Sequence, residues 1–328
     1  MILLTLQDVP PWDTPAPPLA SALETPNTAP HDSPVPLAMK PLDNRAWLLL
    51  VPAGAVMAFV GLIPLVSVLN FSFHDIFSLD QAYWIGTEWY ADLVASPRFH
   101  ASLARSLLFS ATVLAVQIPL GIAIAVLVVG SGRAGTAILL LVAVPLVVPW
   151  NMIPMMWLSL IHPDTGPLGR AMAALGIDFD HKFTALHTWA LLVVMDTWHW
   201  TGLVVILATA ALSGIPRPYY QAAAIDGASR LAVFRHIELP RIAGALGIVF
   251  LLRFVDSLMI YTEAFTINAG GPDGATTFLA LELGEEIKGF TYGAAAARSI
   301  VYFVIVITVV WAFLSITRHR ARDPGATA

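Results

Sequence analysis

Residues 219–244 read YYQAAAIDGASRLAVFRHIELPRIAG and separate two long apolar segments of the chain. Pro218 suits the first turn of a helix, and YYQAAAI is compatible with a short helix. Asp226-Gly227 should end that helix, because glycine readily adopts the left-handed conformation found after helix ends. The first half of the stretch therefore predicts a short helix and a sharp turn.

The second half predicts another short helix. Ser229 can cap its beginning, and we expect Pro240 to disrupt its continuation. Its apolar stripe consists of Leu231, Phe234 and Ile237. On spacing alone, such a helix could equally lie in the headgroup layer of a membrane, with Arg230 and Arg235 near lipid phosphates.

The composition around this stretch is that of a membrane protein. Apolar residues make up 57% of the 328 positions and charged residues only 12%, against roughly 25% charged residues in soluble domains. The net charge of −5 is spread among the loops, so no basic stripe indicates nucleic acid. Cysteine is absent, which excludes disulfides, thiolate metal sites and cysteine nucleophiles.

The fold class expected is an all-α membrane protein with six transmembrane helices, since a spanning helix needs about 20 mostly apolar residues. The six segments that qualify are Ala46–Asn70, Ser106–Val129, Thr136–Ile161, Leu186–Leu212, Ile242–Ile267 and Ser299–Thr317.

The distribution of Lys and Arg predicts that both termini are cytoplasmic. With the N-terminus inside, the outer segments hold six bases and eleven acids. The inner segments then carry Lys40, Arg45, Arg133, Arg217, Arg230, Arg235, Arg241, Arg318, Arg320 and Arg322. Residues 219–244 are therefore expected on the cytoplasmic side.

Three regions follow from this pattern. Residues 1–45 contain ten prolines and five acids against two bases, which is typical of a disordered tail, here expected in the cytoplasm. No signal peptide is expected, because MILLTLQDVPPW turns acidic and proline-rich after six residues. Residues 46–317 form the predicted transmembrane domain, with a loop at 218–240, and residues 318–328 a cytoplasmic C-terminal tail.

The loop resembles the EAA loop of the membrane subunits of binding-protein-dependent ABC importers. That pattern is Glu-Ala-Ala, two residues, Asp-Gly-Ala, five residues, Phe, two residues, Ile, one residue, Leu-Pro. The residues in register are Ala222, Ala223, Asp226, Gly227, Ala228, Phe234, Ile237, Leu239 and Pro240. Gln221 stands where the family has Glu, so a negative charge that could pair with the ATPase is lost, and Gly244 replaces a second proline of many relatives.

The resemblance implies that the loop is a coupling helix that docks on an ATPase subunit. It also implies the partners: two ATPase subunits, a second permease that is homologous but a different chain, an extracytoplasmic solute-binding protein and the lipid bilayer of a bacterial inner membrane. We expect no cofactor on this chain and no enzymatic activity, with ATP and Mg bound by the partner ATPase. A P-loop needs Lys followed by Ser or Thr, whereas Lys40, Lys182 and Lys288 precede Pro, Phe and Gly.

Charged residues inside the fifth span are candidates for a substrate path. Arg253, Asp256, Ile260 and Glu263 follow a helical spacing that places them on one face, which should point inward. Asp256 or Glu263 could accept hydrogen bonds from substrate hydroxyls. Alternatively, an Arg253–Asp256 pair could serve only helix packing, and a proton relay is a third hypothesis.

Two other spans contribute candidates. In MDTWHWTG of the fourth span, Asp196, His199 and Trp200 share a face, and a carboxylate beside aromatic rings suits a polyhydroxylated ligand. Packing or interfacial anchoring explains these residues as well, and a metal site lacks further nearby ligands. In the third span, VAVPLVVPWNMIPMMW predicts a helix broken by prolines that exposes Asn151 and a tryptophan, although packing also accounts for it.

Two further motifs are similar to the carbohydrate-type, MalF-like branch of these importers. They are Gly270-Gly271-Pro272, expected to form an outward turn, and GFTYGAAAARS. The branch implies a permease subunit for a sugar, polyol or glycerol-type solute, with a sugar phosphate such as glycerol phosphate as the alternative. Amino acids are less expected. A different class, the ion-coupled secondary transporter, would use the buried carboxylates to couple ion movement to transport. A membrane-embedded enzyme is a third hypothesis, but no nucleophile–base or metal motif favours it.

Overall fold

The computed structural model describes residues 48, 50–78 and 81–322. The chain divides into two compact units, residues 1–57 and 58–328. The first unit contributes only Leu48, Leu50 and the first turns of α1 (Val51–Phe71) to the described residues. The predicted tail at 1–45 lies outside them, as do residues 323–328 of the predicted C-terminal tail.

Long apolar helices dominate the described chain. Five helical stretches are long and apolar enough to cross a membrane, and Gly132–Val147 is a shorter apolar helix. The five are Val51–Phe71, Pro97–Val128, Ala185–Ser213, Arg230–Asn268 and Tyr292–Ile316. They correspond to α1, α3 (Pro97–Val128), α7 (Ala185–Ser213), α9 to α11 and most of α13 (Tyr292–Arg322).

The third predicted span is broken, as its prolines indicated. α4 (Gly132–Val147) ends before Pro149, and α5 (Ile153–Ile161) begins with Pro154 in its first turn. Proline lacks the N–H that a continuing helix needs, whereas it fits a first turn. The prediction of one segment over 136–161 is therefore replaced by two helices joined by a short link.

The fifth predicted span differs from expectation at both ends. Pro240 does not disrupt the preceding helix, because α9 (Arg230–Val233) continues through a π-helical turn (Phe234–Glu238) into α10 (Leu239–Leu258), where Pro240 occupies the first turn. At the other end, the expected continuous stripe is wrong: α10 stops at Leu258 and α11 (Thr262–Asn268) starts after a three-residue break.

The remaining elements are short. The helices are α2 (Glu88–Ala95), α6 (Pro167–Ala174), α8 (Arg217–Ile225), α12 (Leu279–Lys288) and a 3-10 turn at Pro272–Gly274. A hairpin of β1 (His74–Ser78) and β2 (Gln81–Trp84) pairs His74 with Trp84 in antiparallel register. The all-α prediction missed this hairpin, which is too short to leave a clear alternating pattern.

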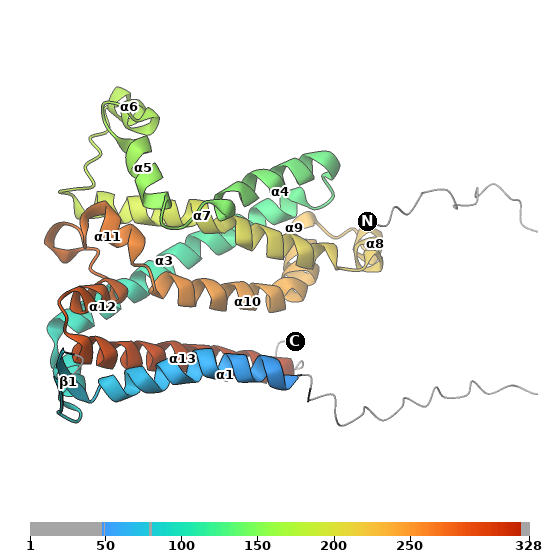
Figure 1. Ribbon diagram of the computed structural model, residues 1–328. Coiled ribbons are helices and arrows are strands. Elements are labelled where there is room, and N and C mark those ends of the chain that lie inside the picture. The colour runs from blue at the N-terminus through green and yellow to red at the C-terminus, as the bar shows by residue number, and fades with distance from the viewer. Residues whose placement is uncertain (1–47, 49, 79–80, 323–328) are drawn as a thin grey trace, which may run out of the picture. The chain divides into compact units, whose positions relative to one another are not determined.

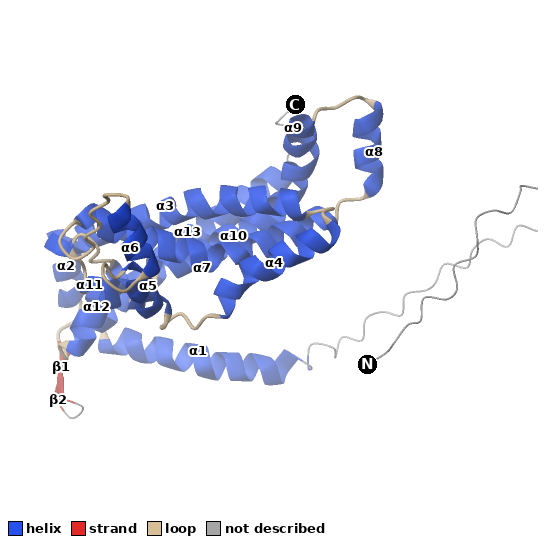
Figure 2. Ribbon diagram, turned by 90° about the horizontal axis from the view of Figure 1, so that it is seen from above, coloured by secondary structure: helices blue, strands red, loops and turns tan. Residues whose placement is uncertain are grey.

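The core of residues 58–328 is formed by α3, α7 and α10, which run side by side (Figures 1 and 2). α7 is the most buried of the candidate spans and also packs against α4. At that contact, a Cβ on Gly202 would meet the carbonyl oxygen of Val142, so the two helices touch at their backbones. Apolar side chains such as Leu140, Leu141 and Leu127 face outward, as expected of helices that lipid surrounds.

Candidate functional site

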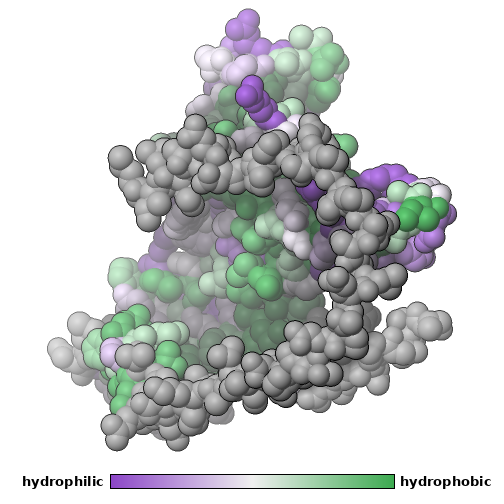
Figure 3. Space-filling view, turned by 90° about the vertical axis from the view of Figure 1, so that its right-hand side faces the viewer, coloured by the Kyte–Doolittle hydropathy of each residue, from purple (hydrophilic) through white to green (hydrophobic). Residues whose placement is uncertain are grey.

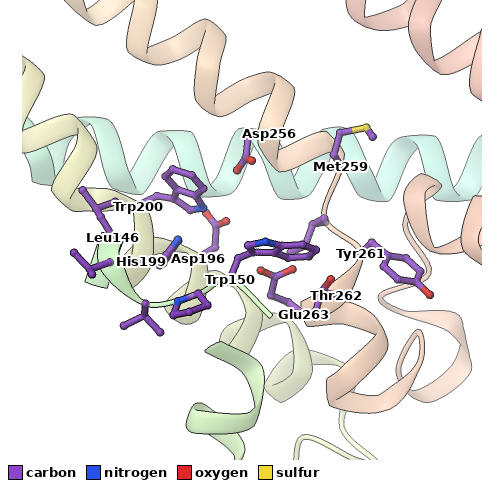
Figure 4. A pocket seen from close by; sticks show the side chains of 14 residues that line it. Leu146, Trp150, Asp196, His199, Trp200, Asp256, Met259, Tyr261, Thr262 and Glu263 are labelled. Carbon is purple, nitrogen blue, oxygen red and sulfur yellow. The ribbon is translucent and has the colours of Figure 1, made fainter. Parts of the chain in front are cut away.

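A cavity of about 600 Å³ opens beside α7, where two helix breaks meet (Figure 4). One wall is the link between α4 and α5, and another is the break between α10 and α11. The lining residues are Leu146, Val147, Val148, Pro149, Trp150, Asp196, His199, Trp200, Asp256, Met259, Ile260, Tyr261, Thr262 and Glu263. Both helix breaks therefore contribute residues to the cavity lining.

Arg253 holds the cavity wall together from behind. Its side chain is fully buried, and Nη2 donates to Asp196 Oδ2 at 2.6 Å while Nε donates to Gln117 Oε1 at 3.0 Å. Nη1 is ion-paired with Asp256. Gln117 in turn donates to Asp196. One guanidinium thus joins α3, α7 and α10, and every one of these polar groups is satisfied, as buried groups must be.

The charge on the cavity surface is negative. Asp196 is nearly buried, Asp256 is half-exposed and Glu263 is partly buried. Arg253 lies behind them, and within the described chain no Lys or Arg lines the cavity. A solute in the cavity therefore meets carboxylates first.

Aromatic side chains complete the lining. Trp150 is 61% exposed, and its ring lies near Glu263 in Figure 4. The Trp200 ring stacks beneath the Arg253 guanidinium, with 4.6 Å from Cζ to the ring centroid. His199 is almost buried, and its Nδ1 has no hydrogen-bond partner among the described residues. That nitrogen is itself buried, so it does not face the open part of the cavity.

The structure brings together six of the seven predicted path residues. Asp196, His199, Trp200, Asp256 and Glu263 line the cavity and Arg253 supports it. Asn151 is exposed in the α4–α5 link and is not among the lining residues.

Sequence reasoning missed four residues of this region. Gln117 is the most informative of them. It is a single amide in the apolar second span, and a polar side chain in such a place indicates a buried hydrogen-bond partner, which is Arg253. The other three are Met259, Tyr261 and Thr262, which belong to a helix break that the sequence did not predict.

The predicted helix, turn and helix at 218–240 are confirmed. α8 ends at Ile225, and Gly227 follows with a φ of +66°, in the left-handed region that glycine adopts without strain. The Ser229 hydroxyl accepts a hydrogen bond from Ala232 N at 3.3 Å and so caps α9. We call residues 218–240 the coupling loop, after the role that the resemblance implies.

The predicted ATPase-coupling residues divide into exposed and packed sets. Ala223 is buried, and Ile237 packs on a core cluster around Leu212 and Ile242. Phe234 and Leu239 are half-buried. The exposed members are Gln221, Ala222, Asp226, Gly227, Ala228 and Pro240. Figure 3 shows the end of the molecule that carries α8. Where grey atoms do not cover this end, hydrophilic and apolar residues lie side by side.

A buried carboxylate closes the coupling loop. Glu238 accepts from Arg230 Nη1 at 2.8 Å and from the Tyr220 hydroxyl at 3.3 Å, which joins α8, α9 and the π-helical turn. Burial, and then the negative charge of Glu238, raise the pKa of Tyr220 above its ordinary value, so the hydroxyl stays a donor. A second cavity of about 570 Å³ lies beside this cluster.

Two further sequence expectations can be placed. The turn at Gly270-Gly271-Pro272 is confirmed: both glycines have positive φ, and Thr276 N donates to the Gly270 carbonyl at 2.7 Å. In the described ranges, no group of three or more His, Asp or Glu side chains is arranged to hold a metal ion.

Residues 117–324 match the family of binding-protein-dependent transport system inner membrane components. The chain belongs to this family. It is therefore a transport permease and a multi-pass membrane protein, and the resemblance noted in the coupling loop is confirmed.

Named relatives extend the match along most of the permease. The trehalose/maltose transport system permease protein MalF of Thermococcus litoralis is 26% identical over 277 residues, covering 84% of this chain and 94% of the relative. The sn-glycerol-3-phosphate transport system permease protein UgpA of Yersinia pseudotuberculosis is 27% identical over 268 residues, covering 80% and 90%.

Solved structures support the fold. A chain of a bacterial ABC transporter that imports the acidic polysaccharide alginate superposes with a TM-score of 0.72 at 20% identity, covering 84% of this permease and 96% of that chain. A second structure of the alginate transporter, in complex with an alginate pentasaccharide-bound periplasmic protein, gives 0.70 at 18% identity and covers 87% and 99%.

Proposed function

We propose that this permease conducts a neutral polyhydroxylated solute, a sugar, polyol or glycerol-type compound, through the cavity between α4, α7 and α10. The observation that carries the proposal is the lining of that cavity. Three carboxylates and two tryptophan rings face the space, while the guanidinium of Arg253 is buried behind them.

The chemistry of this lining suits hydroxyl groups. Carboxyl oxygens accept hydrogen bonds, so a solute hydroxyl can donate one to Asp256 or to Glu263. The rings of Trp150 and Trp200 offer flat apolar surface for the C–H faces of a solute.

A sugar phosphate is the second candidate, because relatives named for glycerol 3-phosphate transport match most of the chain. For an anion, Arg253 would have to turn toward the cavity. Its side chain is fully buried and bonded to Asp196, Asp256 and Gln117, so the carboxylates would repel a phosphate before the guanidinium reached it. The neutral solute is the candidate that the geometry favours.

The membrane arrangement proposed has six spans in a bacterial inner membrane, with both termini in the cytoplasm. α4 and α5 together form the third span, and α10 with α11 forms the fifth. The basic residues of the coupling loop then lie on the cytoplasmic side, in agreement with the excess of Lys and Arg expected there.

Transport is driven by partners. Two ATPase subunits bind ATP and Mg and dock on the coupling loops, a second, homologous permease completes the pathway, and an extracytoplasmic solute-binding protein delivers the solute. Exposed apolar side chains at the tip of the loop, among them Ile225 and Leu231, fit an element that inserts into a protein cleft.

Mild solubilisation of the C-terminally tagged permease from its native membrane tests the assembly. Mass spectrometry should find an ATPase and a second permease. The binding protein of the same system should then be stabilised against heating by neutral sugars or polyols and not by glycerol phosphate or uronates. A chain that purifies alone, even after crosslinking in the membrane, would contradict the importer, and an anionic ligand would contradict the neutral solute.

A further inference from the structure

We infer that Glu238 is a positioning residue that fixes the coupling loop to α10, so that movement of the loop is carried to the cavity. The inference rests on the proposed docking of the loop on an ATPase and names the group inside this chain that passes the movement on.

Glu238 occupies the junction of three segments. Its side chain is 6% exposed, and its carboxylate receives Arg230 from α9 and Tyr220 from α8. Tyr220 lies on the far side of the Gly227 turn, 18 residues away in sequence. One carboxylate therefore closes the turn and joins both short helices to the beginning of α10.

The backbone before α10 is shaped to present this carboxylate. Residues 234–238 form a π-helical turn, and Leu239 N donates to the carbonyl of Phe234, five residues earlier. A π-helical turn holds one residue more than an α-helical turn, and such turns occur often at functional sites. The same turn supplies Glu238 and leads directly into α10, where Pro240 lies in the first turn.

α10 can carry movement because it is anchored at both ends. The 20 residues of α10 span about 30 Å at 1.5 Å per residue. Near its other end, Arg253 is fully buried and bonded to Gln117 of α3 and Asp196 of α7. Glu238 and Arg253 thus attach one helix to the coupling loop and to the cavity wall.

A buried carboxylate is a poor choice if stability alone matters. Replacing a buried ion pair by apolar groups of similar volume is frequently neutral or stabilising. What the Glu238 cluster provides is a fixed orientation, because a carboxylate with two directed donors holds α8 and α9 at set angles to α10.

The test uses the whole complex purified with its partners and a reporter in the cavity. Met259 lines the cavity and is half-exposed, and the chain has no cysteine, so Met259→Cys accepts an environment-sensitive fluorophore. The complex without that cysteine is treated with the same fluorophore, and its signal, which comes from the partner subunits, is subtracted from that of the labelled variant. In a separate complex, a photoreactive phenylalanine analogue at Ile225, which is 86% exposed, reports docking on the ATPase.

ATP should change the fluorescence at position 259 in the parent complex. Glu238→Gln, and independently Tyr220→Phe, should reduce that change by roughly fivefold or more, the size of a typical coupling effect, while photocrosslinking and ATP hydrolysis persist. Tyr219→Phe is the matched control, because Tyr219 is the exposed neighbour: its ring stacks under Arg241, and its hydroxyl makes no hydrogen bond within the described residues.

Each outcome decides one claim. An undiminished ATP response in both Glu238→Gln and Tyr220→Phe overturns the role of Glu238. An equal loss in Tyr219→Phe also overturns it, because the effect would not depend on the cluster. Absence of a crosslink to an ATPase in the parent complex would instead refute the proposed docking. Tyr220→Phe removes one oxygen only, so the test stands if Glu238→Gln fails to assemble.

Discussion

Two buried charged clusters lie near opposite ends of α10, and they are built differently. Glu238 is bonded to Arg230 and Tyr220, which are 8 and 18 residues away. Arg253 reaches Gln117, 136 residues earlier, and Asp196, 57 residues earlier. The first cluster closes a local turn, whereas the second exists only after α3, α7 and α10 have packed.

The two clusters also differ in exposure. Arg230 is 56% exposed, so water still solvates it if its partner is lost. The Arg253 side chain is fully buried, so water cannot replace a partner that it loses. We expect loss of the buried members of the Arg253 cluster to affect folding, and mutations in the coupling loop to affect transport.

Replacing Arg253 by methionine should give the largest loss of stability, about 3–5 kcal/mol, because it leaves the buried Asp196 without its cation. Thermal unfolding of the purified permease complex measures the loss. Arg241→Met is the matched control and should change stability by less than about 0.5 kcal/mol, since Arg241 is exposed. Equal losses in both variants would remove the distinction between the clusters.

Replacing Gly227 by valine should abolish solute uptake while the permease still inserts. A residue with a Cβ costs roughly 1–2 kcal/mol in the left-handed region, more when β-branched, and the turn that orients α8 would open. Uptake in membrane vesicles and the amount of inserted permease are the measurements. Gly132→Val is the control, because Gly132 also has a positive φ and open space around it. Normal uptake by Gly227→Val would count against docking.

Replacing Asp256 by asparagine should reduce uptake about tenfold through the loss of an acceptor for solute hydroxyls, an effect of about 1.4 kcal/mol. Stability should fall by less than about 1 kcal/mol, since the Asp256 side chain is 47% exposed. Uptake rates and thermal unfolding of the same preparation separate the two effects. Unchanged uptake would mean that Asp256 serves only to pair with Arg253.

Replacing Asn151 by alanine should have the smallest effect. Asn151 is exposed in the α4–α5 link and does not line the cavity, so uptake and stability should both stay near those of the parent, within about 0.5 kcal/mol. Its neighbour Trp150 does line the cavity, and Trp150→Ala provides the positive control. A loss of uptake in Asn151→Ala equal to that in Trp150→Ala would extend the site into the link.

What the sequence predicted well was local. The helix, turn and helix around Gly227, the broken third span and the common face of Asp196, His199 and Trp200 follow from capping, proline and helical spacing. These features depend on residues within a few turns of one another, and their physical causes are visible in a short window.

What the sequence could not predict depends on tertiary packing. Nothing near Gln117 indicates that Arg253 will lie against it, because that contact depends on how α3 meets α10. The break at residues 259–261 contains no proline or glycine that would predict it. Pro240 was expected to end a helix, but a π-helical turn, which no short pattern specifies, precedes it and the helix continues.

The break between α10 and α11 has a consequence for the energetics of the resting membrane. The helix is interrupted at residues 259–261, which in the proposed arrangement lie within the fifth span. Three carboxylates line the cavity at this break, so we expect water to fill it when no solute is bound. If both ends of a water-filled space in a bilayer open together, protons and small ions leak through it across the membrane. Sealing one end at all times is therefore a condition for keeping the membrane energised, as necessary as the transport of solute.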